Sequence, residues 1–267
     1  MVNTRQAGSI SVFFPAYNDA STIARMVGDA LALLPQVSDD YEVIVVNDGS
    51  TDETFAVLET LTRSSPHVKV INHERNQGYG GALRSGFLKA TKDLIFYTDG
   101  DGQYDARELK HLLPLLARNV DIVNGYKLKR SDARHRRMLG ATYNKLARFM
   151  FRLQVRDVDC DFRLIRRQAL RNINLEASSG VICVELVRKL HDAGCAFAEC
   201  PVRHYPREHG KSQFFTARRV SRTALDFLLL WVQLVALRRS SSAPQRNVRM
   251  ISSEQSVAND DVRIVSE

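Results

Sequence analysis

Two hydrophobic periods alternate along the first 125 residues of the chain. Short runs of β-branched and aromatic residues, typical of buried strands, are followed by longer stretches in which apolar residues recur at the helical spacing. This alternation predicts an α/β fold with a doubly wound, mostly parallel sheet flanked by helices. The expected strands lie at residues 10–14, 42–46, 68–72, 94–97 and 121–123. The expected helices lie at about 20–34, 52–64, 79–91 and 105–118.

The second half of the chain has a less regular pattern. An apolar helix is expected at about 216–237, and after Arg239 the sequence turns serine-rich and polar, which predicts a largely disordered tail. The other expected elements are a helix that ends near 151, a strand near 162–165, a helix near 183–193 and a strand near 197–201. We therefore divide the chain into a domain at 1–215, an apolar helix at 216–239 and a polar tail at 240–267.

Two carboxylates end the fourth expected strand. The apolar run that begins at Leu94 stops on Asp99 and Asp101, with one glycine between them. Side chains at i and i+2 of an extended segment point the same way, so both carboxylates can reach one hard divalent cation. Ions such as Mg²⁺ commonly share carboxylates with substrate phosphates, which predicts a phosphorylated ligand nearby. A plain turn of Asp and Gly residues is the alternative.

The first two strands also lead into carboxylates. Asp19 follows the first strand and Asp48 ends the second. Ligands of doubly wound sheets bind beyond the carboxyl ends of the strands, where an Asp can accept hydrogen bonds from a ribose or nucleobase. Helix capping is the alternative for Asp19 and for Asp52. The glycine-rich segment at 74–86 is typical of a phosphate loop that runs into a helix, but it lacks the position and spacing of a dinucleotide site.

Composition and charge narrow the classes of protein. The chain has 267 residues, 44% of them hydrophobic, which suffices for one large core. Its net charge of +8 is concentrated at 125–222, where 22 Lys and Arg stand against 9 Asp and Glu, and such a field favours phosphates, nucleic acid or an anionic membrane. No nucleic-acid recognition motif is visible, so we expect no nucleic-acid partner. Four cysteines without a Cys-x-x-Cys pair, and no signal peptide before the first strand, predict reduced thiols in a cytosolic protein.

Seven segments in order make the chain resemble the family 2 glycosyltransferases of GT-A fold, in particular the polyprenyl-phosphate (dolichyl-phosphate-type) sugar transferases. The likeness runs from about Ile10 to Phe215. Each segment alone is unspecific, and their order carries the resemblance. The segments are Pro15 to Asp19, Val46 to Asp52, Asn76 to Gly86, Asp99 to Gln103, Gly125 to Lys127, Asp159 to Arg163 and His204 to Ser212.

The resemblance implies which residues bind the donor. Asp19 and Asp48 match residues that contact the base and ribose of the donor nucleotide. Pro15, Tyr17 and Gly78 lie in the same motifs and are expected to line the donor site. The donor implied by the resemblance is a nucleotide sugar of the UDP-glucose or GDP-mannose type.

The resemblance also implies a metal and diphosphate site. Asp99, Asp101 and Gln103 match the residues that hold Mg²⁺ or Mn²⁺ and the donor diphosphate. Arg207 and Lys211 match residues that close over the diphosphate. We expect Asp101, Arg207 and Lys211 to be catalytic, because they would neutralise the charge that develops on the departing nucleoside diphosphate.

The acceptor side is implied by the same comparison. Lys127 and Arg136 correspond to basic residues that receive the acceptor phosphate, and Arg163 is expected to join them. Asp161 and Glu185 are the candidate bases. A phosphate monoester is largely dianionic at neutral pH, because its second pKa is about 6, so it needs no strong base. A sugar hydroxyl would need one.

The chain departs from the family pattern at four positions. Asp19 replaces the more usual Glu and has a shorter reach. Lys127 replaces an Arg, so that a point charge stands in place of a planar fork. Gly140 stands where a phosphate-binding Ser is often found, and Asp161 stands where many members have Gly. These departures concern mainly the acceptor contacts.

The predicted activity is inverting transfer of a hexose to polyprenyl phosphate at the membrane surface. One alternative is a family 2 transferase that acts on a saccharide hydroxyl in cell-envelope polysaccharide synthesis. The other is a non-catalytic binding module, which is weakened by the joint presence of Asp99, Asp101, Gln103, Arg207 and Lys211.

The apolar segment at 223–237 bears on membrane access. Its fifteen residues include Asp226 and Gln233, whereas a spanning helix needs about 20 apolar residues. Flanking arginines and the internal Trp231 favour a helix that lies on an anionic leaflet. Core packing or a dimer interface is the alternative. We expect a cytoplasmic, peripheral protein on the inner face of the membrane, with its own lipid access or a membrane-protein partner.

Overall fold

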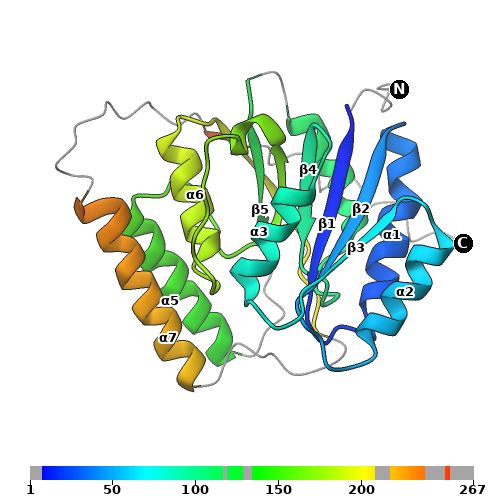
Figure 1. Cartoon of the computed structure of the whole chain (residues 1–267). Helices are drawn as coiled ribbons and strands as arrows, with labels where there is room; N and C mark the ends of the chain where they lie inside the picture. Colours follow the sequence, from blue (N-terminus) through cyan, green and yellow to red (C-terminus); the bar gives the residue numbers. More distant parts are fainter. Residues whose placement is uncertain (1–7, 117–118, 129–133, 208–216, 238–249, 253–267) are drawn as a thin grey trace, which may run out of the picture.

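Eight strands of the described part of the chain form one sheet (Figure 1). The computed structural model describes residues 8–116, 119–128, 134–207, 217–237 and 250–252. The strand order is β3-β2-β1-β4-β6-β5-β7-β8, and the printed register is parallel except where β6 pairs with β4 and β5. The strands are β1 (Ile10–Ala16), β2 (Tyr41–Asn47), β3 (Val68–Asn72), β4 (Leu94–Thr98), β5 (Ile122–Lys127), β6 (Phe162–Arg166), β7 (Phe197–Val202) and β8 (Met250–Ser252).

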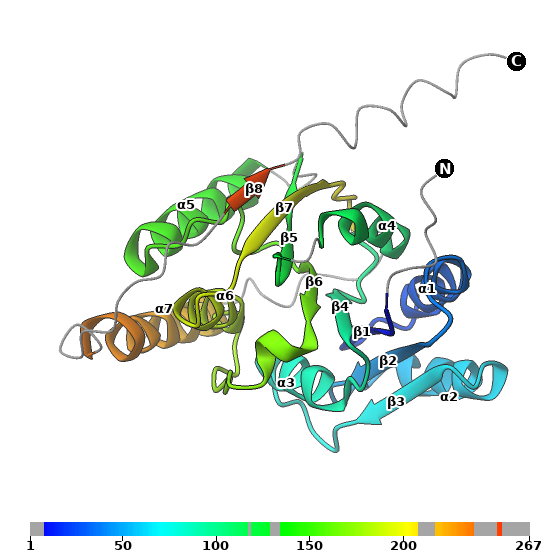
Figure 2. The same cartoon turned by 90° about the horizontal axis from the view of Figure 1, so that it is seen from above.

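Helices cover both faces of the sheet (Figure 2). Alternate residues of β1 point to opposite faces, so that Val12 and Phe14 join one hydrophobic cluster and Phe13 joins the other. On the first face lie α1 (Ile23–Val37), α2 (Thr54–Ser64) and the short segments η2 (Ala106–Glu108), α4 (Leu109–Leu112) and η3 (Leu113–Leu115). On the second lie α3 (Tyr79–Lys89), α5 (Arg134–Phe151), α6 (Ile182–Asp192) and α7 (Ala217–Trp231), which continues as η5 (Val232–Ala236).

The predicted α/β architecture is confirmed, with three differences in detail. The helix expected at 105–118 is broken into short pieces, because Pro114 lacks the backbone N–H that a continuous helix requires there. β6 runs antiparallel to its neighbours, a direction that the hydrophobic pattern does not encode. Within the expected polar tail, Met250–Ser252 forms β8 beside β7. The rest of that tail lies outside the described residues.

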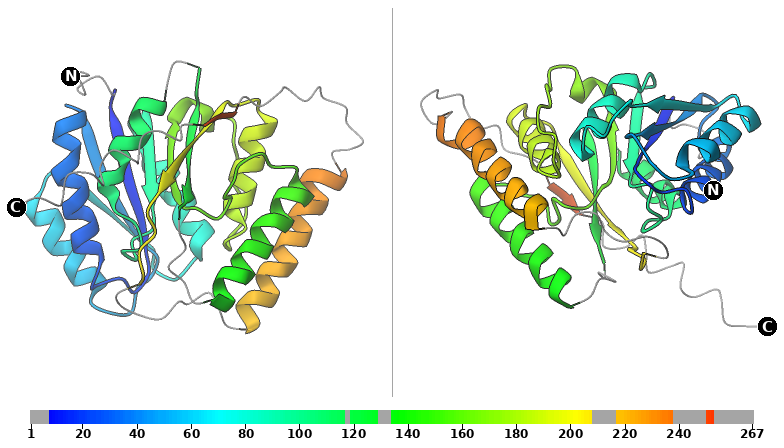
Figure 3. Two further views of the ribbon diagram at one scale, coloured as in Figure 1. Left: turned by 180° about the vertical axis from the view of Figure 1, so that it is seen from behind. Right: turned by 60° about the horizontal axis from the view of Figure 1, so that its bottom comes forward.

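α7 and η5 occupy most of the stretch at 216–237, and α7 packs against α5, beside which it lies in Figures 1 and 3. Phe227 of α7 contacts the rings of Tyr143 and Phe151, at centroid distances of 5.6 and 5.2 Å. The indole of Trp231 donates a hydrogen bond of 3.0 Å to the carbonyl of Met150. One face of α7 is thus part of the core, as the alternative of core packing anticipated.

Both helices also carry large apolar side chains that are exposed. On α7 and η5 the exposed apolar residues include Leu225, Leu228, Leu229 and Val232. On α5 they include Met138, Leu139, Leu146 and Phe149. No helix of the described residues is both long enough and apolar enough to span a bilayer.

Candidate active site

A cavity of about 570 Å³ lies where β1, β2 and β4 end. β1 lies between β2 and β4, because the chain continues from β1 to β2 and β3 on one side and then returns to form β4 on the other. Doubly wound sheets bind ligands at such a switch point, where the strand order reverses. Eight of the residues predicted to form the site line this cavity: Pro15, Tyr17, Asp19, Asp48, Gly78, Asp99, Asp101 and Arg207. Lining residues that the sequence reading did not single out include Tyr79, Ser178, Ser179, Gly180, Arg222 and Thr223.

The loops that follow the strands are held together by hydrogen bonds between residues far apart in the sequence. Asn18, after β1, has a φ of 58°, and its side-chain oxygen accepts a hydrogen bond of 2.8 Å from the backbone N–H of Thr51, after β2. Gly100, after β4, donates its N–H to the carbonyl of Pro15 at 3.2 Å. A Cβ at position 100 would lie 2.9 Å from that oxygen, so the close approach requires glycine.

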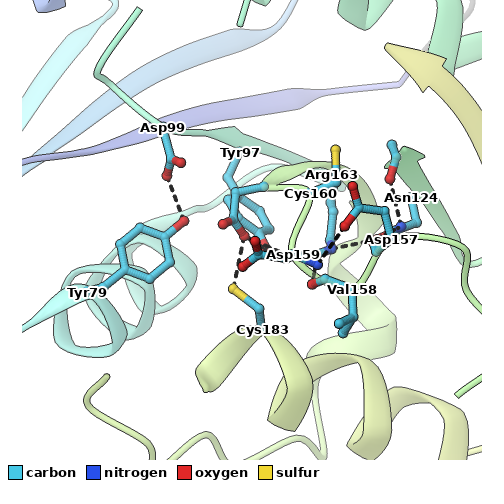
Figure 4. Close-up of polar contacts among 12 residues, drawn as sticks. Tyr79, Tyr97, Asp99, Asn124, Asp157, Val158, Asp159, Cys160, Arg163 and Cys183 are labelled. Carbon is cyan, nitrogen blue, oxygen red and sulfur yellow. Dashed lines mark hydrogen bonds and ion pairs between the residues drawn. The ribbon is translucent and has the colours of Figure 1, made fainter. Parts of the chain in front are cut away.

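Asp99 is the carboxylate at the floor of the cavity. The hydroxyl of Tyr79 donates a hydrogen bond of 2.7 Å to it (Figure 4). Burial, followed by the nearby charges of Asp161 and Asp101, raises the pKa of Asp99 well above its usual range. An ionised carboxylate is therefore costly at this position unless a cation compensates its charge.

Asp101 forms an ion pair with Arg207, whose guanidinium closes over the same side of the cavity. The backbone N–H of Gln103 donates to the Asp101 carboxylate at 3.0 Å. The side-chain amide of Gln103 donates to the carbonyl of Tyr205 at 3.2 Å. Gln103 does not line the cavity. The described contacts of Gln103 are thus with Asp101 and Tyr205, and its role as a metal and donor ligand stays a prediction.

Asp19 lines the cavity next to Asp101. Its carboxylate accepts the backbone N–H of Tyr17 at 2.9 Å. Burial raises the pKa of Asp19 to about 6, and the Asp101 charge adds to the shift, while Tyr17 and Arg207 oppose it. By contrast, the carboxylate of Asp52 accepts the N–H of Thr54, the first residue of α2, at 3.0 Å, and that of Ala20 at 3.3 Å, while Glu53 occupies the N-cap position.

The glycine-rich segment owes its glycines to packing against another loop. Gly80 donates its N–H to the carbonyl of Ser178 at 2.9 Å. A Cβ on Gly78 would lie 2.5 Å from that same oxygen, and one on Gly80 would lie 2.1 Å from the carbonyl of Ala177. These contacts bring residues 178–180, at the start of α6, onto the cavity wall opposite β1. The sequence signal was present as Ser-Ser-Gly before a helix, but only the fold places it beside the strand ends.

Two of the three predicted acceptor-phosphate residues are turned inward. Arg163 is 1% exposed and donates to Asn124, Tyr97, Asp161 and the carbonyl of Val158 (Figure 4). The ammonium of Lys127, with a 6% exposed side chain, lies 3.7 Å from the Asp157 carboxylate and donates to the carbonyl of Asp159.

Neither of these cations lines the cavity and both have internal partners, so their role as phosphate ligands stays a prediction. The third residue, Arg136, belongs to α5, and its side chain lies outside the described residues. Lys211, predicted to be catalytic, also lies outside them.

The two candidate bases are engaged by internal partners. The Asp161 carboxylate lies 3.0 Å from the Arg163 guanidinium and 2.9 Å from the Cys183 sulfur. Glu185 is 1% exposed, accepts the backbone N–H groups of Glu176 and Ala177, and pairs with Lys189 at 2.6 Å. Glu185 therefore fixes the loop before α6, and neither carboxylate lines the cavity.

The carboxylates of the cavity fit a hard divalent cation whose coordination shell the substrate would complete. Among the described residues, no group of three or more His, Cys, Asp or Glu side chains converges as a self-sufficient metal site. Asp99 and Asp101 offer two carboxylates in one cavity, and a cation would favour the ionised form of Asp99 that burial disfavours. Mg²⁺ is typically held by one or two carboxylates together with substrate phosphates, which matches this pair.

Comparison with known proteins assigns the family. A model of the family described as "Glycosyl transferase family 2" matches residues 11–173. The chain belongs to glycosyl transferase family 2. The matched region runs from β1 beyond β6 and contains every strand end that borders the cavity. Membership in family 2 confirms the resemblance on which the site residues were selected.

Two family 2 relatives illustrate the similarity. Undecaprenyl-phosphate 4-deoxy-4-formamido-L-arabinose transferase of Sodalis glossinidius is 27% identical over 220 residues, which cover 80% of this chain and 65% of that protein. Glycosyltransferase AglD of Haloferax volcanii is 29% identical over 234 residues, which cover 84% of this chain and 37% of that protein. The chain thus spans less than two thirds of the length of these relatives.

Solved structures share the fold. Glucosyl-3-phosphoglycerate synthase from Mycobacterium tuberculosis, in complex with UDP, matches with a TM-score of 0.64 at 18% identity, over 85% of this chain and 82% of that one. The same enzyme with Mn²⁺, UDP and phosphoglyceric acid also has a TM-score of 0.64. At this level of identity the comparison bears on the fold alone, and it confirms the predicted GT-A architecture.

Proposed function

We propose that the chain is an inverting glycosyltransferase that moves a hexose from a nucleotide-diphospho sugar to polyprenyl phosphate at a membrane surface. The observation that carries the proposal is the convergence of Asp19, Asp48, Asp99, Asp101 and Arg207 in one cavity at the switch point of the sheet. Family membership supports the reaction class, and the name of the Sodalis relative, an undecaprenyl-phosphate transferase, supports the acceptor class.

The part of the cavity proposed to bind the nucleotide sugar has one group of residues for the nucleoside and another for the diphosphate. Asp19 and Asp48, after β1 and β2, offer acceptors to the base and ribose of a UDP or GDP sugar. Asp99 and Asp101, after β4, suit a divalent cation that is shared with the diphosphate, with Arg207 beside them. When Mg²⁺ or Mn²⁺ is bound there, it supplies neutralisation of the charge on the departing nucleoside diphosphate. Arg207 would leave Asp101 for the diphosphate and add to that neutralisation.

We infer a phosphate acceptor because neither of the two candidate bases is available to a substrate in the cavity. Asp161 and Glu185 are both occupied by internal hydrogen bonds and lie off the cavity wall. A saccharide hydroxyl would need a base, whereas a phosphate monoester with a second pKa of about 6 is already a competent nucleophile at neutral pH. Its oxygen attacks the anomeric carbon as the bond to the donor diphosphate breaks, which inverts the configuration.

Arg222 is the described cation that best fits the acceptor phosphate. Lys127 and Arg163 are sequestered, whereas Arg222 of α7 is exposed and lines the cavity together with Thr223. These two residues stand on the helix that carries the exposed leucines. A phosphate that arrives from a membrane on that side would meet Arg222 first.

A transfer assay tests the proposed function. The purified full chain would be incubated with Mn²⁺ or Mg²⁺, a panel of UDP and GDP sugars and polyprenyl phosphate in detergent, followed by mass spectrometry of the lipid. Formation of a glycosylated lipid from one donor is expected, and chelation with EDTA should abolish it. Transfer to a saccharide with none to the lipid would overturn the acceptor class.

Arg222→Ala should lower kcat/KM for polyprenyl phosphate by about 10- to 100-fold, because a charge-assisted hydrogen bond to phosphate is lost. Affinity for the nucleotide, measured by calorimetry with UDP or GDP, should stay unchanged. Arg137→Ala is the matched control, since Arg137 is exposed on α5 and does not line the cavity. An equal loss in both variants would indicate general attraction to lipid rather than a phosphate contact.

The exposed apolar side chains of α5 and α7 support peripheral membrane binding. These two helices carry exposed leucines and also many of the chain's arginines. This combination favours binding at the interface of an anionic leaflet. Such binding would place the cavity mouth near Arg222 at the height of the lipid phosphates.

A double variant tests this surface. Leu225→Glu with Leu229→Glu should weaken co-sedimentation with vesicles of phosphatidylglycerol at least about tenfold, because two leucines lose burial and two anions are added. Leu88→Glu with Phe55→Glu is the control, since those residues are comparably exposed on α3 and α2. Unchanged binding of the first variant would remove this face from the proposal.

A further inference from the structure

Asp48 has one carboxylate oxygen fully engaged and one available. Its Oδ1 lies 2.6 Å from Nδ1 of His73 and accepts the backbone N–H of Gln77 at 2.8 Å. Its Oδ2 has no hydrogen-bond partner among the described residues. Asp48 lines the cavity although it is only 3% exposed. The side chain is therefore held by one oxygen and presents the other to a ligand.

His73 is fixed on its far side as well. It follows β3 directly, and its backbone N–H donates to the carbonyl of Asn47 at 2.9 Å, which extends the pairing of β2 and β3. Its Nε2 lies 2.8 Å from the hydroxyl of Ser85 on α3, and its side chain is 6% exposed. An ionised Asp only accepts, so Nδ1 carries the proton, while the Ser85 hydroxyl can donate to or accept from Nε2.

The order of these contacts matches that of a Ser-His-Asp triad, but the polarity of the site is reversed. In a hydrolase the serine meets the substrate. Here Ser85 does not line the cavity, and Asp48 is the member that does. The side chain that faces the ligand is thus a hydrogen-bond acceptor, Asp48, and the role of the other two side chains is to orient it.

We propose that His73 is a positioning residue for the donor nucleotide. His73 holds the Asp48 side chain so that the free carboxylate oxygen of Asp48 accepts hydrogen bonds from the nucleoside. The ligand groups recognised this way are hydrogen-bond donors, either the ribose hydroxyls or a base N–H. The inference rests on the proposed function, because it takes the cavity to be a nucleotide site. His73 acts through Asp48 and does not itself line the cavity.

The physical reason lies in the rotation of a carboxylate. The terminal torsion of Asp is broad, so an unrestrained side chain would have to be ordered when the ligand binds. His73 and Gln77 both fix Oδ1, and each supplies a hydrogen bond to a charged group. Loss of the imidazole removes half of that restraint and leaves Asp48 in a buried position with one donor fewer.

Three substitutions separate positioning from packing. His73→Asn places an amide N–H near the position of Nδ1 and keeps the contact with Asp48, whereas His73→Gln places its amide near Nε2 and His73→Leu has neither. Calorimetry with UDP and with GDP in Mn²⁺ should give wild-type affinity within about threefold for His73→Asn and a loss of about tenfold for the other two. Affinity for inorganic pyrophosphate should be unchanged in all three.

A double-mutant cycle with Asp48→Asn completes the test. If His73 acts through Asp48, His73→Leu should have little further effect on UDP or GDP affinity in the Asp48→Asn background. Thermal melting identifies any variant that fails to fold, and if His73→Leu fails, the contrast between His73→Gln and His73→Asn carries the comparison. Wild-type affinity in a folded His73→Leu protein, or additive losses in the cycle, would overturn the inference alone. A wild-type protein that binds neither nucleotide would overturn the proposed function and this inference with it.

Discussion

Asp101→Asn should lower metal-dependent transfer by about 10³-fold, since it removes one of two carboxylates for the cation and unbalances the charge at the leaving group. In the unliganded structure the Asp101 carboxylate holds Arg207, so this substitution also releases the guanidinium. We expect kcat to fall in the transfer assay and Mn²⁺-dependent UDP or GDP binding to weaken in calorimetry. Folding should be unaffected, because Asp101 lines a cavity and is not part of the core.

Asp105→Asn provides the matched control for Asp101. Asp105 lies four residues further along the same loop, does not line the cavity, and uses its carboxylate to pair with Arg107 at 2.8 Å. It should keep nearly full transfer activity. Near-normal turnover of Asp101→Asn, or an equal loss in Asp105→Asn, would exclude Asp101 as a ligand of the catalytic cation.

Asp19→Asn should stabilise the metal-free protein at neutral pH while it weakens donor binding. The pKa of Asp19 is raised from 3.8 to about 6 by burial first and by Asp101 next. A raised carboxyl pKa favours the folded state below the unfolded value of 3.8, and that contribution is lost as the pH rises through about 6. The difference corresponds to about 3 kcal/mol, and the Asp19→Asn variant would not lose it because an amide does not ionise.

Denaturant unfolding in EDTA between pH 4.5 and 8 measures this effect. The free energy of unfolding of Asp19→Asn should exceed that of the wild type by about 3 kcal/mol at pH 8, and the gap should shrink toward pH 4.5. Asp52→Ala is the control of opposite sign, because the Asp52 side chain accepts the N–H of Thr54 and loss of this acceptor should destabilise the fold. A pH-independent gap would contradict the electrostatic cause.

A gain in stability that accompanies a loss of binding would mark Asp19 as a residue kept for function. The same reasoning applies to Asp99, whose pKa burial raises well above its usual range. Buried carboxylates without a stabilising cation are uncommon in cores, since the charged form is costly there. Their clustering at one switch point is what we expect of the site that we propose for a cation and a diphosphate.

On the acceptor side, the sequence motifs and the lining of the cavity point to different cations. Lys127 and Arg163 stand in the right motifs, yet each faces internal carboxylates and carbonyls. A motif match places a residue along the chain, whereas the direction of its side chain depends on β5 and β6, which pair antiparallel. Arg222, by contrast, belongs to no recognised motif and lines the cavity because α7 packs beside the sheet.

His73 was overlooked for a related reason. Carboxylates and glycines at strand ends are typical of ligand sites, whereas a histidine after the third strand carries no signal by itself. Its significance comes from β3 lying next to β2, which brings the imidazole to Asp48, and from α3, which brings Ser85 to its other side.

The sequence by itself determined the α/β architecture, the positions of most strands and helices, and the gathering of four carboxylates at one cavity. Asp48 and Asp99 follow a strand directly, Asp19 and Asp101 come shortly after one, and the parallel strands that carry them end at one edge of the sheet. Only the tertiary structure decided which cations reach the cavity and which carboxylates are occupied. Those outcomes depend on contacts between residues far apart in the chain, such as Arg163 with Tyr97 and Asp48 with His73, which no local pattern encodes.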